Sequence, residues 1–216
     1  MNSILLDTMP TLVSLLAVTI YYKRLQPKWL QLFFYFLLFT LVIETGAALY
    51  SQRYQKSNHF ILNIYLLFNF CFYLWIFIKA FAKRSFKIFA WVALLLFVLF
   101  YLADIIFIEG FYYFNIYSFC IGSILIVLSC LLYFMSLFTS DKLINYFTIP
   151  MFWISTGLLF FYVGNLVQMS LLKYIIDNHL DPGGEIYLFI SVTLNVLLYG
   201  ALTISFLCKQ PWKKAG

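Results

Sequence analysis

Seven apolar runs of about 20 residues follow one another along this chain of 216 residues, with only short polar gaps between them. A helix of about 20 apolar residues is long enough to cross a hydrocarbon core of about 30 Å. Runs such as "WVALLLFVLFYL" are apolar on every side, whereas the strands of a membrane β-barrel alternate. Only 10% of the residues are charged, against about a quarter in soluble domains. We therefore predict an all-α, polytopic membrane protein.

The seven runs predict one domain, residues 1–216, built as a seven-transmembrane-helix bundle. The spans cover residues 4–22, 29–50, 59–78, 88–108, 112–138, 149–176 and 185–207. Pro10 divides the first run, and the apolar stretch after it is too short to cross alone, so this span must extend back through Asp7 and accept a kink. A cleaved signal peptide is the rival interpretation, but Lys23 and Arg24 follow the apolar run instead of preceding it. We interpret the run as a helix.

Basic residues are concentrated on one side of the predicted bundle. That side has eleven of the 14 basic residues: Lys23, Arg24, Lys28, Lys79, Lys83, Arg84, Lys87, Lys142, Lys209, Lys213 and Lys214. The other side has Arg53, Lys56 and Lys173, together with Asp177, Asp181 and Glu185. Because cytoplasmic loops collect Lys and Arg, we expect the amino terminus outside and the carboxyl terminus inside. The net charge of +6 suits an anionic inner leaflet and needs no nucleic acid to explain it.

Several polar side chains lie inside the predicted spans, where a central charge costs on the order of 2.5–3.5 kcal/mol. Such groups normally face the bundle interior and often mark function. In the predicted orientation, Glu44 and Asp104 lie about 9 Å and about 6 Å below the outer ends of their spans. The candidate ligand-binding residues are Glu44, Asn63, Asn69, Asp104, Tyr162, Asn165, Gln168, Asn195 and Tyr199.

Helical spacing groups some of these candidates on common faces. Ser191, Asn195 and Tyr199 recur every four residues, and Tyr162 and Asn165 are followed at similar spacing by Gln168 or Met169; both faces are predicted to look inward. Polar groups concentrated in the outer half predict a cavity open to the outside. The alternative is that the amides only link helices by hydrogen bonds.

The two carboxylates are predicted to differ in environment. The residues that follow Glu44, from Gly46 to Ala48, supply no cation, so this group needs a proton, a metal or a basic partner, for which His59 and Lys173 are candidates. Asp104 lies within one turn of the predicted interface and is followed by Glu109, so we expect it to reach water.

Cofactor and metal chemistry finds little support in the sequence. His59 and His179 are the only histidines, too few for the usual three-ligand catalytic zinc set, and "DNHLDPGGE" does not match a calcium loop and predicts a solvated turn. The seventh span has no lysine for a retinal Schiff base, and the catalytic motifs of hydrolases and metalloproteases are absent. We name no metal, cofactor or catalytic residue. Gly157 and Gly164 predict close helix packing in the sixth span.

Two stretches carry a resemblance. "FWISTGLLFFYVGNLVQMSLLKYI" with "VTLNVLLYGALTISFLC", and "IETGAALY" with "NHFILNIYLLFNFCFYL", resemble spans of small multi-spanning proteins from Bacteroidota, including the membrane sensor regions that precede histidine kinases there. The resemblance covers roughly residues 40–78 and 150–207 and implies a sensory or accessory membrane domain in a bacterial inner membrane. It places Glu44, Gly164, Asn165 and Asn195 at group-typical positions, whereas Asn69 stands where an acidic residue is expected.

Three functions remain open on the sequence. The first is a sensory or ligand-binding membrane protein with no effector domain of its own, in which Glu44 holds a ligand group that Asn165 and Asn195 orient, and which relays to a separate partner. The second is a membrane enzyme that acts on a lipid through Glu44 and Asp104. The third is a small carrier or structural subunit.

Overall fold

The computed structural model describes residues 2–139, 145–178, 181 and 183–208, with the backbone alone for residues 2–7, 172–174, 176 and 177. Its long helices are α1 (Asn2–Tyr21), α2 (Leu32–Tyr54), α3 (His59–Ala80), α4 (Arg84–Ala103), α5 (Ile116–Phe138), α6 (Pro150–Asp177) and α7 (Glu185–Leu207). A π-helical turn at Asp104–Ile108 extends α4. The part of the chain that is described contains no strand, which confirms the all-α prediction.

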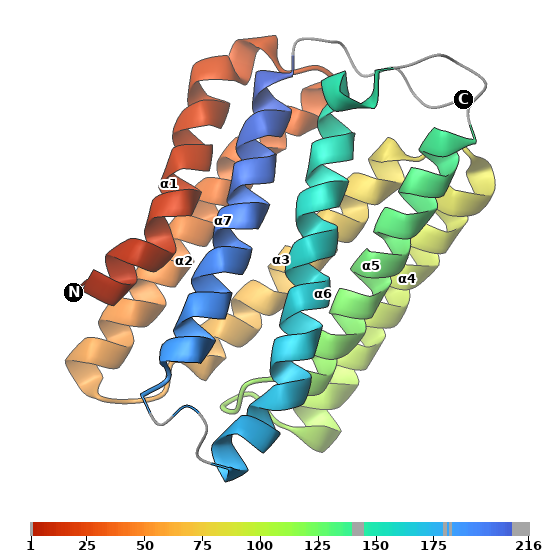
Figure 1. Ribbon diagram of the computed structural model, residues 1–216. Coiled ribbons are helices and arrows are strands. Elements are labelled where there is room, and N and C mark those ends of the chain that lie inside the picture. The colour runs from red at the N-terminus through yellow and green to blue at the C-terminus, as the bar shows by residue number, and fades with distance from the viewer. Residues whose placement is uncertain (1, 140–144, 179–180, 182, 209–216) are drawn as a thin grey trace.

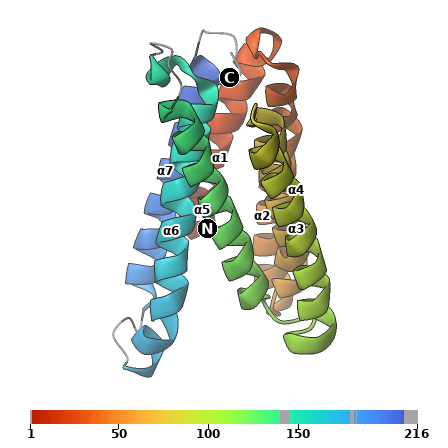
Figure 2. The same cartoon turned by 90° about the vertical axis from the view of Figure 1, so that its right-hand side faces the viewer.

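The helices run up and down in one bundle (Figure 1). We call the end that carries the α2–α3, α4–α5 and α6–α7 connections the lower end, and the opposite end the upper end. Helix α7 packs between α1 and α6, while α3 contacts α2, α4 and α5. Seen from the side, α5 crosses obliquely between α6 and the α3–α4 pair (Figure 2), consistent with its contacts to all three.

Within the described residues, six helical segments are long and apolar enough to cross a membrane: Lys28–Tyr54, His59–Ala80, Arg84–Ile108, Ile116–Phe138, Pro150–Leu171 and Glu185–Leu207. The bundle is therefore consistent with an integral membrane protein in contact with lipid. Their bounds follow the predicted spans, although the second segment continues to Tyr54 instead of residue 50 and the fourth begins at Arg84 instead of residue 88. The start of the fifth is a correction. The fifth span was predicted from residue 112, but α5 begins only at Ile116. The preceding connection is irregular and includes Gly110 in a left-handed conformation, with φ of 81°.

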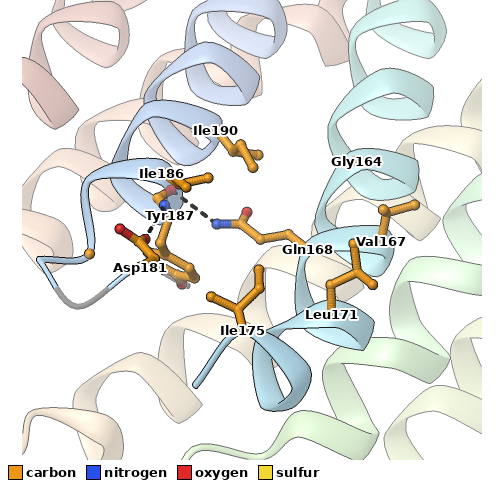
Figure 3. Close-up of a pocket in the computed structure, with 10 residues that line it drawn as sticks. Gly164, Val167, Gln168, Leu171, Ile175, Asp181, Ile186, Tyr187 and Ile190 are labelled. Carbon is orange, nitrogen blue, oxygen red and sulfur yellow. Dashed lines mark hydrogen bonds between the residues drawn. The ribbon is translucent and has the colours of Figure 1, made fainter. Parts of the chain in front are cut away.

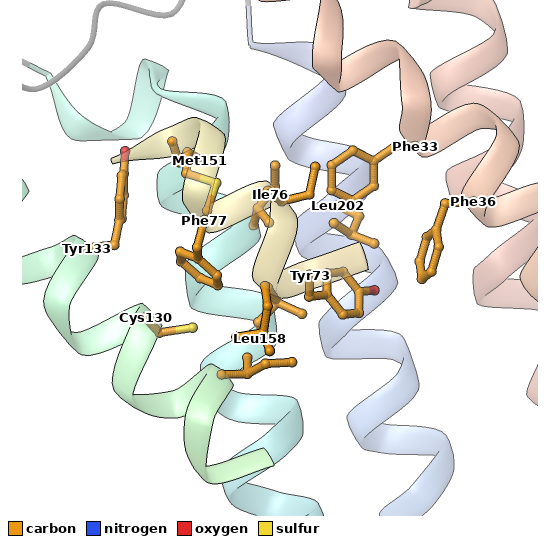
Figure 4. Close-up of a cluster of buried hydrophobic side chains, with 14 of the residues drawn as sticks. Phe33, Phe36, Tyr73, Ile76, Phe77, Cys130, Tyr133, Met151, Leu158 and Leu202 are labelled. Carbon is orange, nitrogen blue, oxygen red and sulfur yellow. The ribbon is translucent and has the colours of Figure 1, made fainter. Parts of the chain in front are cut away.

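The upper half of the bundle is filled by an apolar and aromatic core (Figure 4). Phe36 stacks on Phe72 with ring centroids 4.0 Å apart, and Phe33 meets Phe72 edge-on at 5.1 Å. Phe77 is fully buried. Edge-to-face and offset stacked rings are the favoured aromatic geometries, so this core fixes the helices that carry it.

Helices α6 and α7 approach closely because glycines leave room for side chains of the facing helix. A Cβ atom at Gly157 would lie 2.8 Å from the Cβ of Ala201 and 3.2 Å from the Leu198 carbonyl oxygen. A Cβ atom at Gly164 would overlap Leu194. The packing role predicted for both glycines is confirmed.

Some predictions concern parts of the chain outside the described residues. These are the basic residues Lys142, Lys209, Lys213 and Lys214, the second histidine His179, and the side chains of Lys173 and Asp177. Within the predicted "DNHLDPGGE" turn, Asn178, Asp181 and residues 183–185 are described.

Candidate functional site

A cavity of about 330 Å³, here called the Glu44 cavity, lies in the lower half of the bundle. Helices α1, α2, α3 and α7 and the α2–α3 connection line it. Its polar lining residues are Thr8, Glu44, Asn58, Ser191 and Asn195, and its apolar ones are Ala47, Ala48, Leu62, Tyr187 and Leu188. The volume is at the small end of the range for ligand pockets. One carboxylate, two hydroxyls and two amides therefore surround a space the size of a small molecule.

Glu44 is half-buried and lies between hydroxyl groups of two other helices. Thr11 on α1 donates to its Oε2 at 3.5 Å, and Tyr199 on α7 donates to its Oε1 at 3.4 Å. A hydroxyl bonded to a carboxylate normally lies about 2.5–2.7 Å away. The two contacts are long, so neither hydroxyl holds the carboxylate tightly.

The hydroxyls around Glu44 continue into a network that joins four helices. Tyr65 on α3 lies near Glu44 and Tyr199, and its hydroxyl is 3.4 Å from the Thr40 hydroxyl on α2. The network thus links α1, α2, α3 and α7 around one acidic group. A displacement of the Glu44 side chain would be felt by all four helices, because each contributes a polar group to the same set of contacts.

The predicted inward face of α7 is confirmed. Ser191 and Asn195 line the Glu44 cavity, and Tyr199 contacts the carboxylate. Gln168 on α6 reaches the same face, since its amide nitrogen donates to the Ser191 hydroxyl at 3.0 Å. Four of the nine candidates, Glu44, Gln168, Asn195 and Tyr199, therefore come together around or beside this cavity.

A row of hydroxyls on α1 belongs to the site and was not among the predicted residues. Thr8, Thr11 and Ser14 are all buried and recur every three residues. Ser14 donates to the Tyr199 carbonyl oxygen at 2.6 Å, which fixes α1 against α7 beside the Glu44 cavity. The signal was present as three small hydroxyl residues spaced three apart along the helix.

Asp104 was expected to reach water, and that expectation is wrong. It is fully buried in the π-helical turn, and its Oδ2 accepts hydrogen bonds from the Ser118 hydroxyl and from the Ser118 backbone N–H at 3.1 Å. Glu109 accepts from the Tyr117 N–H at 3.3 Å. Both carboxylates thus cap the first turn of α5, where unpaired N–H groups favour negative charge. The cap from Asp104 could not be predicted from the residues at the start of α5, because Asp104 belongs to the extension of α4.

Burial raises the pKa of the Glu109 carboxyl above its ordinary value, and the nearby Asp104 acts in the same direction. The Tyr117 N–H opposes this shift, because a donor to the carboxylate favours its ionised form. Glu109 also lines a second lower cavity of about 670 Å³, to which His59 contributes. In that cavity His59 lies beside Phe114, with ring centroids 6.1 Å apart.

Asn63 organises the connection between α4 and α5. Its amide nitrogen donates to the carbonyl oxygens of Phe111 and Tyr113 at 3.0 and 2.6 Å. Its Oδ1 accepts from the Asn115 backbone N–H at 3.1 Å. Three bonds to backbone groups of one loop give this buried amide a structural role.

The two remaining amides lie in separate surroundings. Asn69 donates to the Tyr162 hydroxyl at 2.8 Å, which links α3 to α6 in the bundle interior. Asn165 donates to the Phe161 carbonyl oxygen of its own helix at 2.8 Å. The predicted face of α6 is therefore divided, because Tyr162 contacts α3 whereas Gln168 contacts α7.

Comparisons with family models, curated proteins and solved structures found no match to this chain. Among the described residues, no group of three or more His, Cys, Asp or Glu side chains is arranged to hold a metal ion. The Glu44 cavity must therefore be interpreted from its own geometry and chemistry.

Proposed function

We propose that this protein is a seven-span membrane receptor for a small polar molecule, which relays binding to a separate protein. The observation that supports this is the Glu44 cavity, in which a carboxylate lies among hydroxyls and amides inside an apolar bundle. A group of this kind is costly to keep in a membrane span and is most readily explained by use.

The ligand is a small cationic or hydrogen-bond-donating molecule. Glu44 attracts positive charge or a donor, while Asn195 and Ser191 offer both donors and acceptors for orientation. At about 30 Å³ for a molecule the size of water, a cavity of about 330 Å³ holds on the order of ten non-hydrogen atoms.

Relay through the bundle follows from the four-helix network. A ligand that draws Glu44 into the cavity would lengthen its already long contacts with Thr11 and Tyr199. Helices α1 and α7 would then be free to move relative to α2, provided that the ligand binds the moved state more tightly. The partner would meet the basic upper end, where Lys79, Lys83 and Arg84 lie at the α3–α4 connection.

In this proposal α1 also crosses the membrane, which brings the number of spans from six to seven. The lower end faces outside, in a bacterial inner membrane. Support for the span comes from the packing of α1 against both α2 and α7 and from its 20-residue length. Support for the orientation comes from the basic residues at the upper connections.

The alternatives have less support. An enzyme that uses Glu44 and Asp104 as acid and base would need both carboxylates at one cavity. Asp104 instead caps α5 through Ser118, while Glu44 contacts α1 and α7. A carrier would be expected to have broken helices near its midplane. The π-helical turn of Asp104–Ile108 instead lies at the lower end of α4, away from the midplane.

Native mass spectrometry of the gently extracted protein tests the proposal, with wild type compared with Glu44→Gln. Glutamine has nearly the same shape but no charge, so the variant should fold and lose a small bound molecule that wild type retains. Glu109→Gln is the matched control, because it removes a carboxylate from the same end outside the Glu44 cavity. Identical bound masses in wild type and Glu44→Gln, or no bound molecule in wild type, would contradict the proposal.

A further inference from the structure

A separate cavity of about 300 Å³, here called the Gln168 cavity, lies between α6 and α7 at the lower end (Figure 3). Its walls are apolar and include Val167, Leu171, Ile175, Ile186 and Ile190. Val167, Leu171 and Ile186 are about half exposed on the outside of the bundle. The cavity therefore adjoins the surface that faces lipid.

One amide side chain lies in this apolar space. Gln168 is only 5% exposed, and its amide nitrogen donates to the Tyr187 carbonyl oxygen at 3.1 Å and to the Ser191 hydroxyl at 3.0 Å. Its Oε1 is buried and has no hydrogen-bond partner among the described residues. Figure 3 shows the side chain extending from α6 into the space toward α7.

The orientation of the amide is fixed by its neighbour. If the oxygen and nitrogen were exchanged, Oε1 would face the Tyr187 carbonyl oxygen, and two acceptors would oppose each other. The oxygen must therefore be the atom left without a partner. A buried acceptor is normally paired, so the cavity lacks a hydrogen-bond donor at this point.

The depth of Gln168 matches the level of lipid headgroups. Gln168 bonds to Tyr187 and Ser191, which lie two and six residues after the start of α7 at Glu185, so it lies about 3–9 Å from the lower end of that helix at 1.5 Å per residue. A lipid whose polar group reached Gln168 could keep its alkyl chain beside Val167, Ile190 and the neighbouring lipid, toward the bilayer centre.

The rim of the cavity carries a negative charge. Asp181 lines it, and the Tyr187 N–H donates to Asp181 Oδ2 at 2.9 Å. This hydrogen bond, with others from the start of α7, lowers the pKa of the Asp181 carboxyl, so the group stays ionised at neutral pH.

The geometry points to a binding site for a neutral, single-chain lipid with a free hydroxyl group, whose O–H donates to Gln168 Oε1 and whose alkyl chain lies between α6 and α7. Phosphate and carboxylate headgroups offer only acceptors when ionised, and Asp181 repels them. An ammonium headgroup would lose its hydration against a neutral amide oxygen, at high cost. The volume holds on the order of ten non-hydrogen atoms, and a longer chain continues into the bilayer.

Photo-crosslinking of the full chain in lipid nanodiscs tests this site. The probe is a hexadecanol derivative with a diazirine in its chain, and the matched probe is its methyl ether, which has the same chain but no donor. We expect the alcohol to label peptides of α6 and α7 that line the cavity about three- to tenfold more than the ether, the difference due to one hydrogen bond. Equal labelling by the two probes would overturn the site and show ordinary contact with surrounding lipid.

Two variants of the chain locate the effect. Gln168→Met keeps the length of the side chain but removes Oε1, and should abolish the preference for the alcohol. Asn165→Leu is the matched control, because that amide bonds within its own helix and does not line the cavity. Val167→Trp, at a half-exposed wall position, should block the alkyl chain and reduce labelling by both probes. An alcohol preference that persists in folded Gln168→Met, or undiminished labelling in Val167→Trp, would contradict the assignment. The readout is labelling of α6 and α7 by the alcohol and not loss of a molecule bound at Glu44, so failure of this site and failure of the proposed receptor function can be told apart.

Discussion

The upper and lower halves of the bundle use the same seven helices in different ways. In the upper half, rings such as those of Phe33, Phe36 and Phe77 fill the space between helices. In the lower half, Glu44 and Gln168 hold polar atoms beside cavities of about 330 and about 300 Å³. The core also reaches the lower half through rings such as Phe97 and Tyr101, but beside α7 the lower half holds polar groups and cavities instead. Polar groups and open space can be kept in a membrane bundle when another region fixes the helices.

Tyr187 lies where the lower cavities meet. It contributes to the Glu44 cavity, the Gln168 cavity and the cavity that contains His59 and Glu109. Its backbone also accepts from Gln168 and donates to Asp181. The start of α7 is therefore the element through which a change in one cavity would reach the others.

The largest expected effect is in the aromatic half. Phe77→Ala should lower the free energy of unfolding by about 3–5 kcal/mol, because it leaves a cavity among fully buried rings. Phe107→Ala, at a position that is 81% exposed, is the control and should change stability little. Thermal unfolding in detergent measures both. Equal losses from the two variants would remove the distinction between core and lipid-facing aromatics.

A smaller effect is expected at the α6–α7 contact. Gly157→Ala should destabilise the protein by about 1–3 kcal/mol, because the new methyl group would press on Ala201 and the Leu198 carbonyl. Gly46→Ala places the same methyl group in α2 with nothing within 4 Å, and should be neutral or slightly stabilising. The difference in melting temperature between the two variants is the measurement, and a stable Gly157→Ala would show that α6 and α7 can separate without cost.

The smallest expected effect is a pH dependence at the lower end. Because the pKa of Glu109 is raised above its ordinary 4.5, the folded state binds this proton more tightly than the unfolded state does. Stability contributed by Glu109 is therefore highest below 4.5 and falls as pH rises from 4.5 to the raised pKa. Glu109→Gln should lack this fall when the two proteins are unfolded across the pH range 4–8. Parallel stability curves would show that the carboxyl is not perturbed by its surroundings.

Much of the architecture could be predicted because each helix is long and apolar. The helix assignment, the close packing at Gly157 and Gly164, and the inward face of Ser191, Asn195 and Tyr199 all follow from local composition and spacing. The α5 start was misplaced because residues 112–114 are aromatic like the span that follows, while the irregular conformation of this connection depends on Asn63 from α3.

The assignment of roles within the candidate set was harder. Nothing local distinguishes Asp104, which caps a neighbouring helix, from Glu44, which lines a cavity. Likewise Gln168 and Asn165 are amides three residues apart, yet one faces α7 and the other bonds to its own helix. Such differences depend on which helix lies opposite, and that is a property of the packed bundle.

The most direct test of the account is whether the Glu44 cavity opens to the outside. With the four native cysteines replaced by serine, Asn195→Cys should react in intact cells with a charged, membrane-impermeant thiol reagent, because this position lines the cavity in the proposed outer half. Leu202→Cys, on the same helix but fully buried in the aromatic half, should not react. Labelling of Asn195→Cys only in inverted membrane vesicles, or no labelling from either side, would contradict an outward-facing binding cavity.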